Sequence, residues 1–481
     1  MIDTRRGIRK FADIDAAESR KDRLILFAVS LAVALPAAYL PAYEGLTPDG
    51  RTTLFILLFA AGLWLSEAIP AFAVSFLIIA LEIVMLGLPG EGRHWEHFLS
   101  PWASPLVFLF LAGFIMAQAA SKTRLDIWMA KRVLFLVGNR PENIMTGMIL
   151  VTFTMSMFIS NTATAALMVA ILFPMLSSMR PDNPYKKGLL LSVTMAANIG
   201  GMGTIIGTPP NAIAAGLLGS QSPSFIGWIA LALPPAVLMV FLLRFVLLKR
   251  YPSSEPAIDL RALHGVDHTD DTSKVHSAVP SVPSWKKSAV VLTFGATVLL
   301  WLTGPLHAIP TTVVSFLPIV VFTMLGILDA DDMRALNWDV IILIVGGLSL
   351  GSAVSASGLD KWIADVFATL SLPFLVLVPL FAYLVVALSN FMSNTAAANI
   401  LLPLVAAVAV VLGNSSPVLA VVTVALSASL AMCLPVSTPP NAIVFASGAL
   451  KSRDFWMMGI LSALFGPLVI LGWIYFVSAA G

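Results

Sequence analysis

Two short polar segments interrupt long apolar runs, and their side chains carry only hydroxyl and amide groups. They are Ser160-Asn161-Thr162 and Ser393-Asn394-Thr395. Serine, asparagine and threonine are favoured at helix N-caps, so we expect each triplet to end one helix and begin another. The start of the new helix presents unpaired N–H groups and positive potential, which suit an anion. Carbonyl oxygens left free at the break suit a hard cation.

A second pair of segments follows the same logic. Thr208-Pro209-Pro210-Asn211 and Thr438-Pro439-Pro440-Asn441 also lie within apolar runs. A residue before proline avoids the α region, and proline is well tolerated at a first helical position. Gly207 allows the backbone to approach closely before the first of these segments. Each segment therefore predicts a broken span with a new half-helix after it.

The regions that hold these four motifs contain no ionisable side chain. Asp, Glu, Lys, Arg and His are absent from Asn143–Met179, Gly188–Leu243 and Val366–Leu450. A proton relay or an arginine clamp needs such groups, so both are excluded beside the motifs. Four half-helix N-termini of ~0.5 charge each supply about +2, which offsets a dianion on a crude count. Sodium ions at the neighbouring carbonyls would supply further positive charge. They would also couple the movement of the anion to the movement of sodium.

The composition is that of a membrane protein. Of 481 residues, 58% are hydrophobic and 11% are charged, the net charge is +2, and the mean hydropathy is +0.92. Soluble domains carry roughly a quarter charged residues. The single cysteine, Cys433, excludes an internal disulfide and a cysteine-based metal cluster. We expect lipid as the solvent and no nucleic-acid partner.

The apolar runs predict an all-α polytopic protein with about 11 spanning helices, since a span needs about 20 apolar residues. The first run follows a charged segment without a cleavage site, so we interpret it as a retained signal-anchor helix. The runs around 144–179 and 372–412 are too long for one span and are interrupted by the triplets, which predicts two re-entrant hairpins. The runs are Leu24–Tyr43, Thr52–Ile69, Ala71–Leu88, Pro105–Ala120, 144–179, Gly188–Leu218, Ile226–Leu248, Ser288–Thr303, Thr311–Leu328, Val340–Ser355, 372–412, Pro417–Leu450 and Trp456–Ala479.

The motifs recur in order, which indicates an internal duplication. The triplets are 233 residues apart, the Thr-Pro-Pro-Asn segments 230 apart, and Leu125-Asp126 returns 234 residues later as Leu359-Asp360. An odd number of crossings separates corresponding points, so the repeats should have inverted topology. In such folds the substrate site lies near the midplane, where broken helices of both halves meet.

The positions of the basic residues place the N-terminus in the cytoplasm. Seven Lys and Arg residues precede the first span, and others cluster where cytoplasmic loops are expected. We divide the chain into a cytoplasmic N-terminal segment (1–23), a first helix with the first repeat (24–250), a cytoplasmic linker (251–287) and the second repeat (288–481). Three histidines of the linker, His264, His268 and His276, have no framework that would fix metal ligands.

Several residues outside the motifs have plainer interpretations. Glu67 precedes Pro70 at an expected helix end, which favours an interfacial role, while Glu82 and Arg244 lie in apolar runs away from the motifs. Lys122–Val137 alternates basic and apolar residues and predicts an interfacial amphipathic helix. Tryptophans near span ends are interpreted as interface anchors. These are Trp64, Trp102, Trp228, Trp301 and Trp456.

The paired Ser-Asn-Thr and Thr-Pro-Pro motifs resemble the divalent anion/sodium symporter family of dicarboxylate, citrate and sulfate carriers, from about Leu24 to the C-terminus. The resemblance implies a homodimer that works by an elevator motion. It also implies two sodium sites, one at Ser156, Ser160, Asn161 and Gly207, the other at Ser389, Ser393, Asn394 and Ser437. The implied substrate ligands are Ser160, Asn161, Thr162, Ser393, Asn394, Thr395, Thr438 and Pro439.

We therefore predict a sodium-coupled symporter of the inner (plasma) membrane that imports C4-dicarboxylates such as succinate, malate or fumarate by alternating access. Two intact triplets favour carboxylates over sulfate, because each can serve one carboxylate. The alternatives are a sodium-independent dicarboxylate or citrate exchanger, a passive channel, and an intramembrane hydrolase. A hydrolase needs a nucleophile with a base at membrane depth, and the serines of the apolar runs have no such partner, so we expect no enzyme activity.

Overall fold

The computed structural model describes residues 4–88, 94–260, 283–369, 373–411 and 417–480, and all regular structure within these ranges is helical. The histidine-containing part of the linker lies outside the described residues. Seven described helices are long and apolar enough to cross a membrane, and five shorter apolar helices accompany them. The short ones belong largely to hairpins and broken spans, which agrees with the predicted profile. The seven are Arg20–Tyr39, Trp95–Lys122, Asn161–Ser178, Phe225–Arg250, Ser284–Leu302, Trp338–Ala356 and Ser452–Val477.

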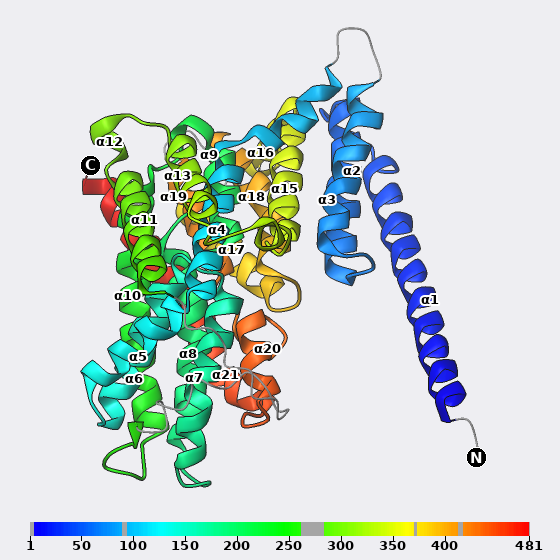
Figure 1. Ribbon diagram of the computed structural model, residues 1–481. Coiled ribbons are helices and arrows are strands. Elements are labelled where there is room, and N and C mark those ends of the chain that lie inside the picture. The colour runs from blue at the N-terminus through cyan, green and yellow to red at the C-terminus, as the bar shows by residue number, and fades with distance from the viewer. Residues whose placement is uncertain (1–3, 89–93, 261–282, 370–372, 412–416, 481) are drawn as a thin grey trace.

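Three helices at the N-terminal end form one edge of the molecule (Figure 1). They are α1 (Thr4–Tyr39), α2 (Pro48–Ser66) and α3 (Ala71–Glu82), which continues as the π-helical turn η1 (Ile83–Gly87). α2 packs on both neighbours, and α3 packs on α15 of the second repeat. The short helix η2 (Trp95–Ala103) then leads into the rest of the chain.

The two predicted repeats appear as matching series of helices. The first comprises α4 (Pro105–Lys122), α5 (Leu125–Val137), α6 (Pro141–Ser156), α7 (Asn161–Ser178), α8 (Tyr185–Gly200), α9 (Pro209–Leu218) and α10 (Phe225–Arg250). The second comprises α15 (Trp338–Ala356), α16 (Leu359–Thr369), α17 (Phe374–Ser389), α18 (Asn394–Val411), α19 (Pro417–Ala428), α20 (Pro439–Ala446) and α21 (Ser452–Ala480). In the predicted second repeat, α15 is preceded by α11 (Ser284–Leu302), α12 (Gly304–His307), α13 (Thr311–Met324) and α14 (Ala330–Arg334).

Each apolar run that carries a triplet folds as a pair of helices joined at the triplet. α6 and α7 form the first hairpin and α17 and α18 the second, and within each pair the helices pack together. In Figure 1 the first hairpin occupies the lower part of the molecule and the second lies above it. The amphipathic helix expected over Lys122–Val137 corresponds to α5, and α16 is its counterpart.

The half-helices after the Thr-Pro-Pro segments pack on the opposite repeat. α9 of the first repeat lies against α18 and α19, whereas α20 of the second repeat lies against α7 and α8. Each repeat thus contributes a half-helix that contacts the hairpin of the other repeat. This reciprocal packing is what an inverted repeat requires when both halves contribute to one central site.

Three of the tryptophans expected as interface anchors, Trp64, Trp228 and Trp301, are buried core residues instead. Trp228 and Trp301 are fully buried. Trp228 donates its indole N–H to the Met202 carbonyl oxygen at 3.2 Å, and Trp301 packs against Phe225 with ring centroids 5.2 Å apart. The prediction was wrong because position near a span end does not reveal which face of the helix is covered. Trp456, by contrast, is exposed.

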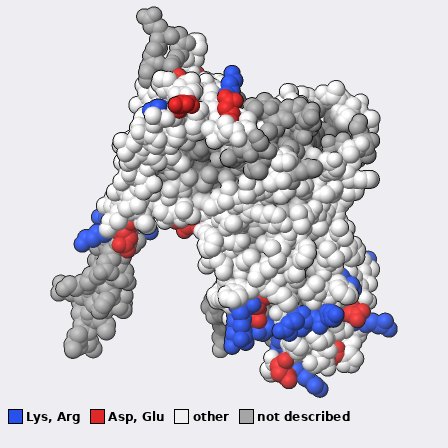
Figure 2. Space-filling view, turned by 180° about the vertical axis from the view of Figure 1, so that it is seen from behind, with Lys and Arg blue, Asp and Glu red and all other residues white. Residues whose placement is uncertain are grey.

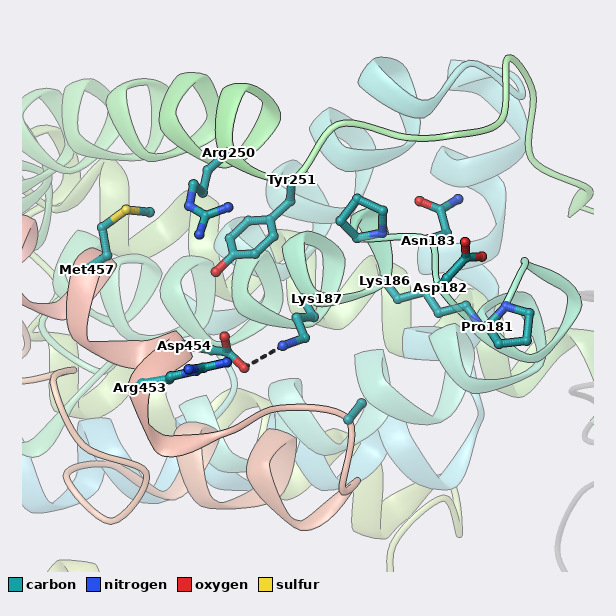
Figure 3. Close-up of a pocket in the computed structure, with 12 residues that line it drawn as sticks. Pro181, Asp182, Asn183, Lys186, Lys187, Arg250, Tyr251, Arg453, Asp454 and Met457 are labelled. Carbon is teal, nitrogen blue, oxygen red and sulfur yellow. Dashed lines mark hydrogen bonds and ion pairs between the residues drawn. The ribbon is translucent and has the colours of Figure 1, made fainter.

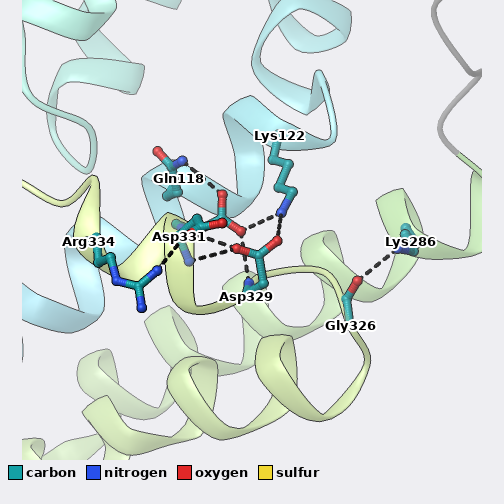
Figure 4. Close-up of polar contacts among 8 residues, drawn as sticks. Gln118, Lys122, Lys286, Gly326, Asp329, Asp331 and Arg334 are labelled. Carbon is teal, nitrogen blue, oxygen red and sulfur yellow. Dashed lines mark hydrogen bonds and ion pairs between the residues drawn. The ribbon is translucent and has the colours of Figure 1, made fainter.

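The face of the molecule seen in Figure 2 has a broad uncharged middle, with charged side chains gathered toward its upper and lower ends. One ionic cluster joins α4 to α14 (Figure 4). Lys122 donates to Asp329 at 2.9 Å and also to Asp332, and Gln118 donates to the other oxygen of Asp332 at 3.2 Å. Asp329 also caps α14 through the backbone N–H groups of Asp331 and Asp332. The cluster holds the end of α4 against α14, the short helix that precedes α15.

This cluster predicts a pH-dependent contribution to stability. The Lys122 ammonium, together with the helix-capping N–H groups, lowers the pKa of Asp329 from 3.8 to about 2. A carboxylate whose pKa is depressed by folding stabilises the protein above its unfolded pKa, and the contribution is lost as the pH falls through the folded pKa. Lys122→Met should lower the Tm by about 2 °C near neutral pH, since exposed ion pairs contribute little.

The difference in Tm between the protein and Lys122→Met should stay constant between about pH 5 and pH 8 and narrow below about pH 4. The measurement is thermal unfolding in detergent, with Lys21→Met as the control, because Lys21 is exposed. An equal loss of Tm in the control variant would show that the cluster contributes no specific stability.

Candidate substrate and sodium site

The first hairpin tip lies against the loop that contains Gly201 and Gly207. Ser156 and Asn161 are two residues of the tip that face this loop. The buried Ser156 hydroxyl lies 2.6 Å from Asn161 Oδ1 and 2.7 Å from the Ala197 carbonyl oxygen. The Asn161 amide fits against Gly201 so closely that a Cβ there would lie 2.6 Å from Oδ1. Gly207 packs on the Gly201 carbonyl with no room for a Cβ. The break thus gathers one hydroxyl, one amide oxygen and backbone carbonyls.

The second tip carries equivalent atoms with fewer internal partners. Ser389 Oγ and Asn394 Oδ1 are buried, and among the described residues neither has a hydrogen-bond partner. Ser437 instead lies 3.0 Å from Asn390 Oδ1, which also accepts the Cys433 N–H at 3.0 Å. Buried oxygens without a donor are costly unless a ligand satisfies them. These two oxygens fit the chemistry of a small cation, which binds oxygen lone pairs.

Both triplets begin helices as expected. Ser160 Oγ accepts the Ala163 N–H at 3.2 Å and caps α7. Ser393 Oγ accepts the Ala396 N–H at 3.1 Å at the start of α18. Thr162 and Ser393 are exposed, while Thr395 is buried. The exposed N-terminal turns leave backbone N–H groups accessible to an anion.

Both Thr-Pro-Pro segments have the predicted backbone. Thr208 and Thr438 are extended, with φ of −153° and −140°, and helices start at Pro209 and Pro439. Thr438 Oγ1 accepts the Asn441 N–H at 3.3 Å, whereas Thr208 forms no such cap. The four half-helix N-termini on which the anion argument depends are therefore present.

The asparagines that close the two Thr-Pro-Pro-Asn segments hold the breaks in place. Asn211 donates its amide group to the carbonyls of Gly201, Met202 and Thr204 at 3.1, 3.3 and 2.8 Å. Asn441 does the same for Met432 and Leu434 at 3.2 and 2.9 Å. The sequence reasoning assigned no role to either side chain. Their recurrence at the same place in both copies was the signal that could have revealed one.

Two hydrogen bonds join the repeats directly at the site. Asn198 of α8 donates to Thr438 Oγ1 at 3.1 Å, and Thr194 of α8 donates to Asn441 Oδ1. α8 also supplies the Ala197 carbonyl that accepts from Ser156. One helix therefore contacts both the first hairpin tip and the second Thr-Pro-Pro segment. Sequence reasoning missed Thr194 and Asn198, because neither lies in a repeated motif.

The second tip also faces the N-terminal helices. A cavity of about 300 Å³ is lined by Ser393 together with Arg23 and Glu67. Glu67 lies directly after α2, in the left-handed conformation with φ of 51°, as expected for a residue at a helix end. The cavity brings an acidic and a basic side chain near the second triplet, which the sequence alone did not indicate.

The two remaining ionisable residues of the apolar runs have structural partners. Glu82 is buried in α3 and accepts from the Ser349 hydroxyl of α15. Arg244 donates to Thr146 Oγ1 at 2.6 Å and so contacts the base of the first hairpin. The sequence placed Arg244 far from the motifs, yet α10 lies against α6 and α8.

Known proteins resemble this chain along most of its length. The family model of the sodium:sulfate symporter transmembrane region matches residues 21–478. A sodium-dependent dicarboxylate transporter of Staphylococcus saprophyticus is 29% identical over 90% of this chain and 87% of its own. The corresponding Staphylococcus aureus (strain MSSA476) protein is 30% identical over 89% and 86%. An uncharacterized transporter of Haemophilus influenzae is 32% identical over 88% and 91%.

Two solved transporters share the fold. The YdaH transporter of Alcanivorax borkumensis has a TM-score of 0.52 at 14% identity, covering 85% of this chain and 98% of its own. MtrF of Neisseria gonorrhoeae, described as an antimetabolite efflux pump, has a TM-score of 0.53 at 12% identity, covering 84% and 94%. Identities this low support the all-helical transporter architecture alone. The family match confirms the resemblance drawn from the paired motifs, and with it the expectation of co-transported sodium: the chain belongs to the sodium:sulfate symporter family.

Proposed function

We propose that this protein is a sodium-coupled symporter that imports small organic dianions, with C4-dicarboxylates such as succinate, malate and fumarate as its substrates. The observation that carries the proposal is the pair of hairpin tips, each at a helix N-terminus within a sequence segment that has no ionisable side chain. The names of the Staphylococcus relatives, which are dicarboxylate transporters, support the same substrate class.

In this proposal each triplet binds one carboxylate of the substrate. Ser160, Asn161 and Thr162 meet the first carboxylate at the start of α7, and Ser393, Asn394 and Thr395 meet the second at the start of α18. Thr438 and Pro439 complete the second side. Helix N-termini favour anions through their free N–H groups and positive potential. The separation of two such ends selects a molecule with two carboxylates.

Sodium ions occupy the oxygen clusters beside the triplets. The first site comprises Ser156, Ser160, Asn161 and Gly207, and the second Ser389, Ser393, Asn394 and Ser437. The unpartnered oxygens Ser389 Oγ and Asn394 Oδ1 support the second site. Hydroxyl, amide and carbonyl oxygens are dipoles whose negative ends would repel a carboxylate. A bound cation reverses this local potential, so substrate binding depends on prior sodium binding.

The proposal extends to the orientation and assembly of the protein. We infer a cytoplasmic N-terminus in the plasma membrane, because basic residues concentrate in the first part of α1, before its apolar run, and at the start of α8. We infer also a homodimer in which the hairpins and broken helices move as an elevator. The reciprocal packing of α9 and α20 supports this, because it joins the moving parts of both repeats into one unit.

The decisive experiment is uptake of labelled succinate, citrate and sulfate into proteoliposomes, each with an inward gradient of sodium or of choline. We expect succinate uptake to require sodium and to exceed uptake of the other two anions. Uptake that is unchanged in choline, together with counterflow between preloaded dicarboxylates, would establish an exchanger and contradict the proposal. Preference for citrate or sulfate would contradict the substrate assignment alone.

Substitution of the triplet asparagines should weaken substrate binding from both sides. Asn161→Ala and Asn394→Ala each remove a polar group at a proposed carboxylate site, and we expect the KM for succinate to rise about 10- to 100-fold. The control is Asn143→Ala, which removes an exposed amide from the base of the same first hairpin. A KM that changes equally in all three variants would contradict the assignment.

The two break-holding asparagines should control sodium affinity. Asn211→Ala and Asn441→Ala release the carbonyls of the two breaks, and we expect the sodium concentration for half-maximal uptake to rise about tenfold. Asn399→Ala is the matched control, because its buried amide donates to the Leu343 carbonyl of α15, outside both breaks. An unchanged sodium dependence in the first two variants, in folded protein, would show that the carbonyls do not bind sodium.

A further inference from the structure

A charged cavity lies away from the hairpin tips. It has a volume of about 950 Å³ and is formed where the start of α8, the end of α10 and the start of α21 meet (Figure 3). Arg250 is the last residue of a candidate membrane span, so the cavity lies at the boundary between the apolar region and water. Its charged lining comprises Lys186, Lys187, Arg250, Arg453, Asp182 and Asp454.

Only part of the positive charge in this cavity is neutralised. Lys187 donates to Asp454 at 2.9 Å, and the same carboxylate oxygen accepts the Lys451 N–H at 2.8 Å. Within the described chain, Lys186 and Arg453 form no ion pair with a carboxylate. Arg250 is held instead over the ring of Tyr251, with Cζ 5.4 Å from the centroid.

The remaining lining therefore has an excess of positive charge. Lys186, Arg250 and Arg453 face a single further carboxylate, that of Asp182. α8 adds positive potential, because it begins here without an acidic residue in its first turn and without a side-chain cap. Guanidinium and ammonium groups around a water-accessible cavity are the usual partners of phosphate and carboxylate oxygens.

We propose that this cavity is a second anion site, which binds an anion carrying two or more negative charges on phosphate or carboxylate oxygens. Such an anion is available from two sources, the headgroup of an anionic phospholipid or a soluble anion of the cytoplasm. Basic cavities between helices at the cytoplasmic boundary suit the former, and the open access to water suits the latter.

The site is separate from the proposed transport site. α8 comprises 16 residues and is about 24 Å long, so its start lies that far from the break at Gly201. The Lys187–Asp454 pair joins α8 of the first repeat to α21 of the second. An anion that bridges Lys186, Arg250 and Arg453 would add a further connection between the same elements and stabilise them against separation.

The test compares three proteins in nanodiscs of phosphatidylcholine: the wild type, Lys186→Gln/Arg453→Gln, and Arg132→Gln/Arg140→Gln. The second variant retains the Lys187–Asp454 pair, and the third removes the same charge from exposed positions outside the cavity. One arm adds cardiolipin to the nanodisc and measures retained lipid by native mass spectrometry. The other arm adds inorganic pyrophosphate and measures the shift in Tm.

We expect at least one probe to bind the wild type and the Arg132→Gln/Arg140→Gln control equally. Binding to Lys186→Gln/Arg453→Gln should be about thirtyfold weaker, because each basic residue near an anionic group contributes roughly a fivefold factor. Binding of cardiolipin alone identifies the lipid source, and binding of pyrophosphate alone identifies the soluble source.

Binding of neither probe, or equal binding to all three proteins, would overturn the proposal. Without added anion, the three proteins should share one Tm, which shows that the cavity variant is folded. Sodium-driven succinate uptake into proteoliposomes of pure phosphatidylcholine should also be the same for all three proteins. That measurement reads the transport function separately, so a failure of the anion site and a failure of the symporter proposal are distinguishable.

Discussion

Backbone polar groups at a helix break within a membrane must find partners inside the protein, because lipid offers none. This constraint shapes the whole centre of the molecule. The carbonyls released at the two broken spans are held by the Asn211 and Asn441 amides, and Trp228 adds a further N–H donor to Met202. A carbonyl has two lone pairs, so an oxygen held by one amide can still bind a cation. The same interaction that makes the break tolerable also fixes its oxygens for a ligand.

The two breaks occupy equivalent positions in the internal duplication, but the residues that surround them differ in chemistry. In the first repeat Gly207 packs against the Gly201 carbonyl. At the equivalent position of the second repeat, Ser437 forms a hydrogen bond with Asn390. Ser156 is bonded within its own repeat, whereas Ser389 has no partner in the described chain. At the position of Gly207 and Ser437 the first oxygen cluster is therefore held by close backbone packing, whereas the second is held by a side-chain hydrogen bond. Because the two proposed sodium sites differ in internal hydrogen bonding, we expect them to differ in sodium affinity, which is a basis for ordered binding.

Much of the architecture could be predicted from the sequence, because breaks in membrane helices leave strong local signals. The triplets and the Thr-Pro-Pro segments located the starts of α7, α9, α18 and α20. The contacts of the site were far less predictable. Thr194 and Asn198 lie in an apolar helix that carries no turn signal, and only the fold brings them to Asn441 and Thr438.

The interpretation of tryptophan failed for the same reason, because burial of Trp228 and Trp301 depends on neighbours distant in the chain. The basic cavity was equally hidden. Its basic residues come from three segments, at the start of α8, the end of α10 and the start of α21, that served in the sequence only to predict orientation. What a local pattern encodes is a change of backbone conformation, whereas convergence of side chains from several elements requires the tertiary packing.

Reciprocal packing gives a physical reason for coupling between ion and substrate. α8 contacts the first hairpin tip through Ala197 and the second Thr-Pro-Pro segment through Asn198. In the proposed arrangement, a cation that orders Ser156 and Asn161 would also fix the end of α8, and hence the position of Thr438 in the proposed substrate site. Ion binding would thereby pre-organise the anion site. A pre-organised site loses less conformational freedom when the dianion binds, so the free-energy cost of binding the dianion is lower. Coupling of this kind needs no charged side chain, which is consistent with the absence of ionisable residues from the sequence segments that hold the four motifs.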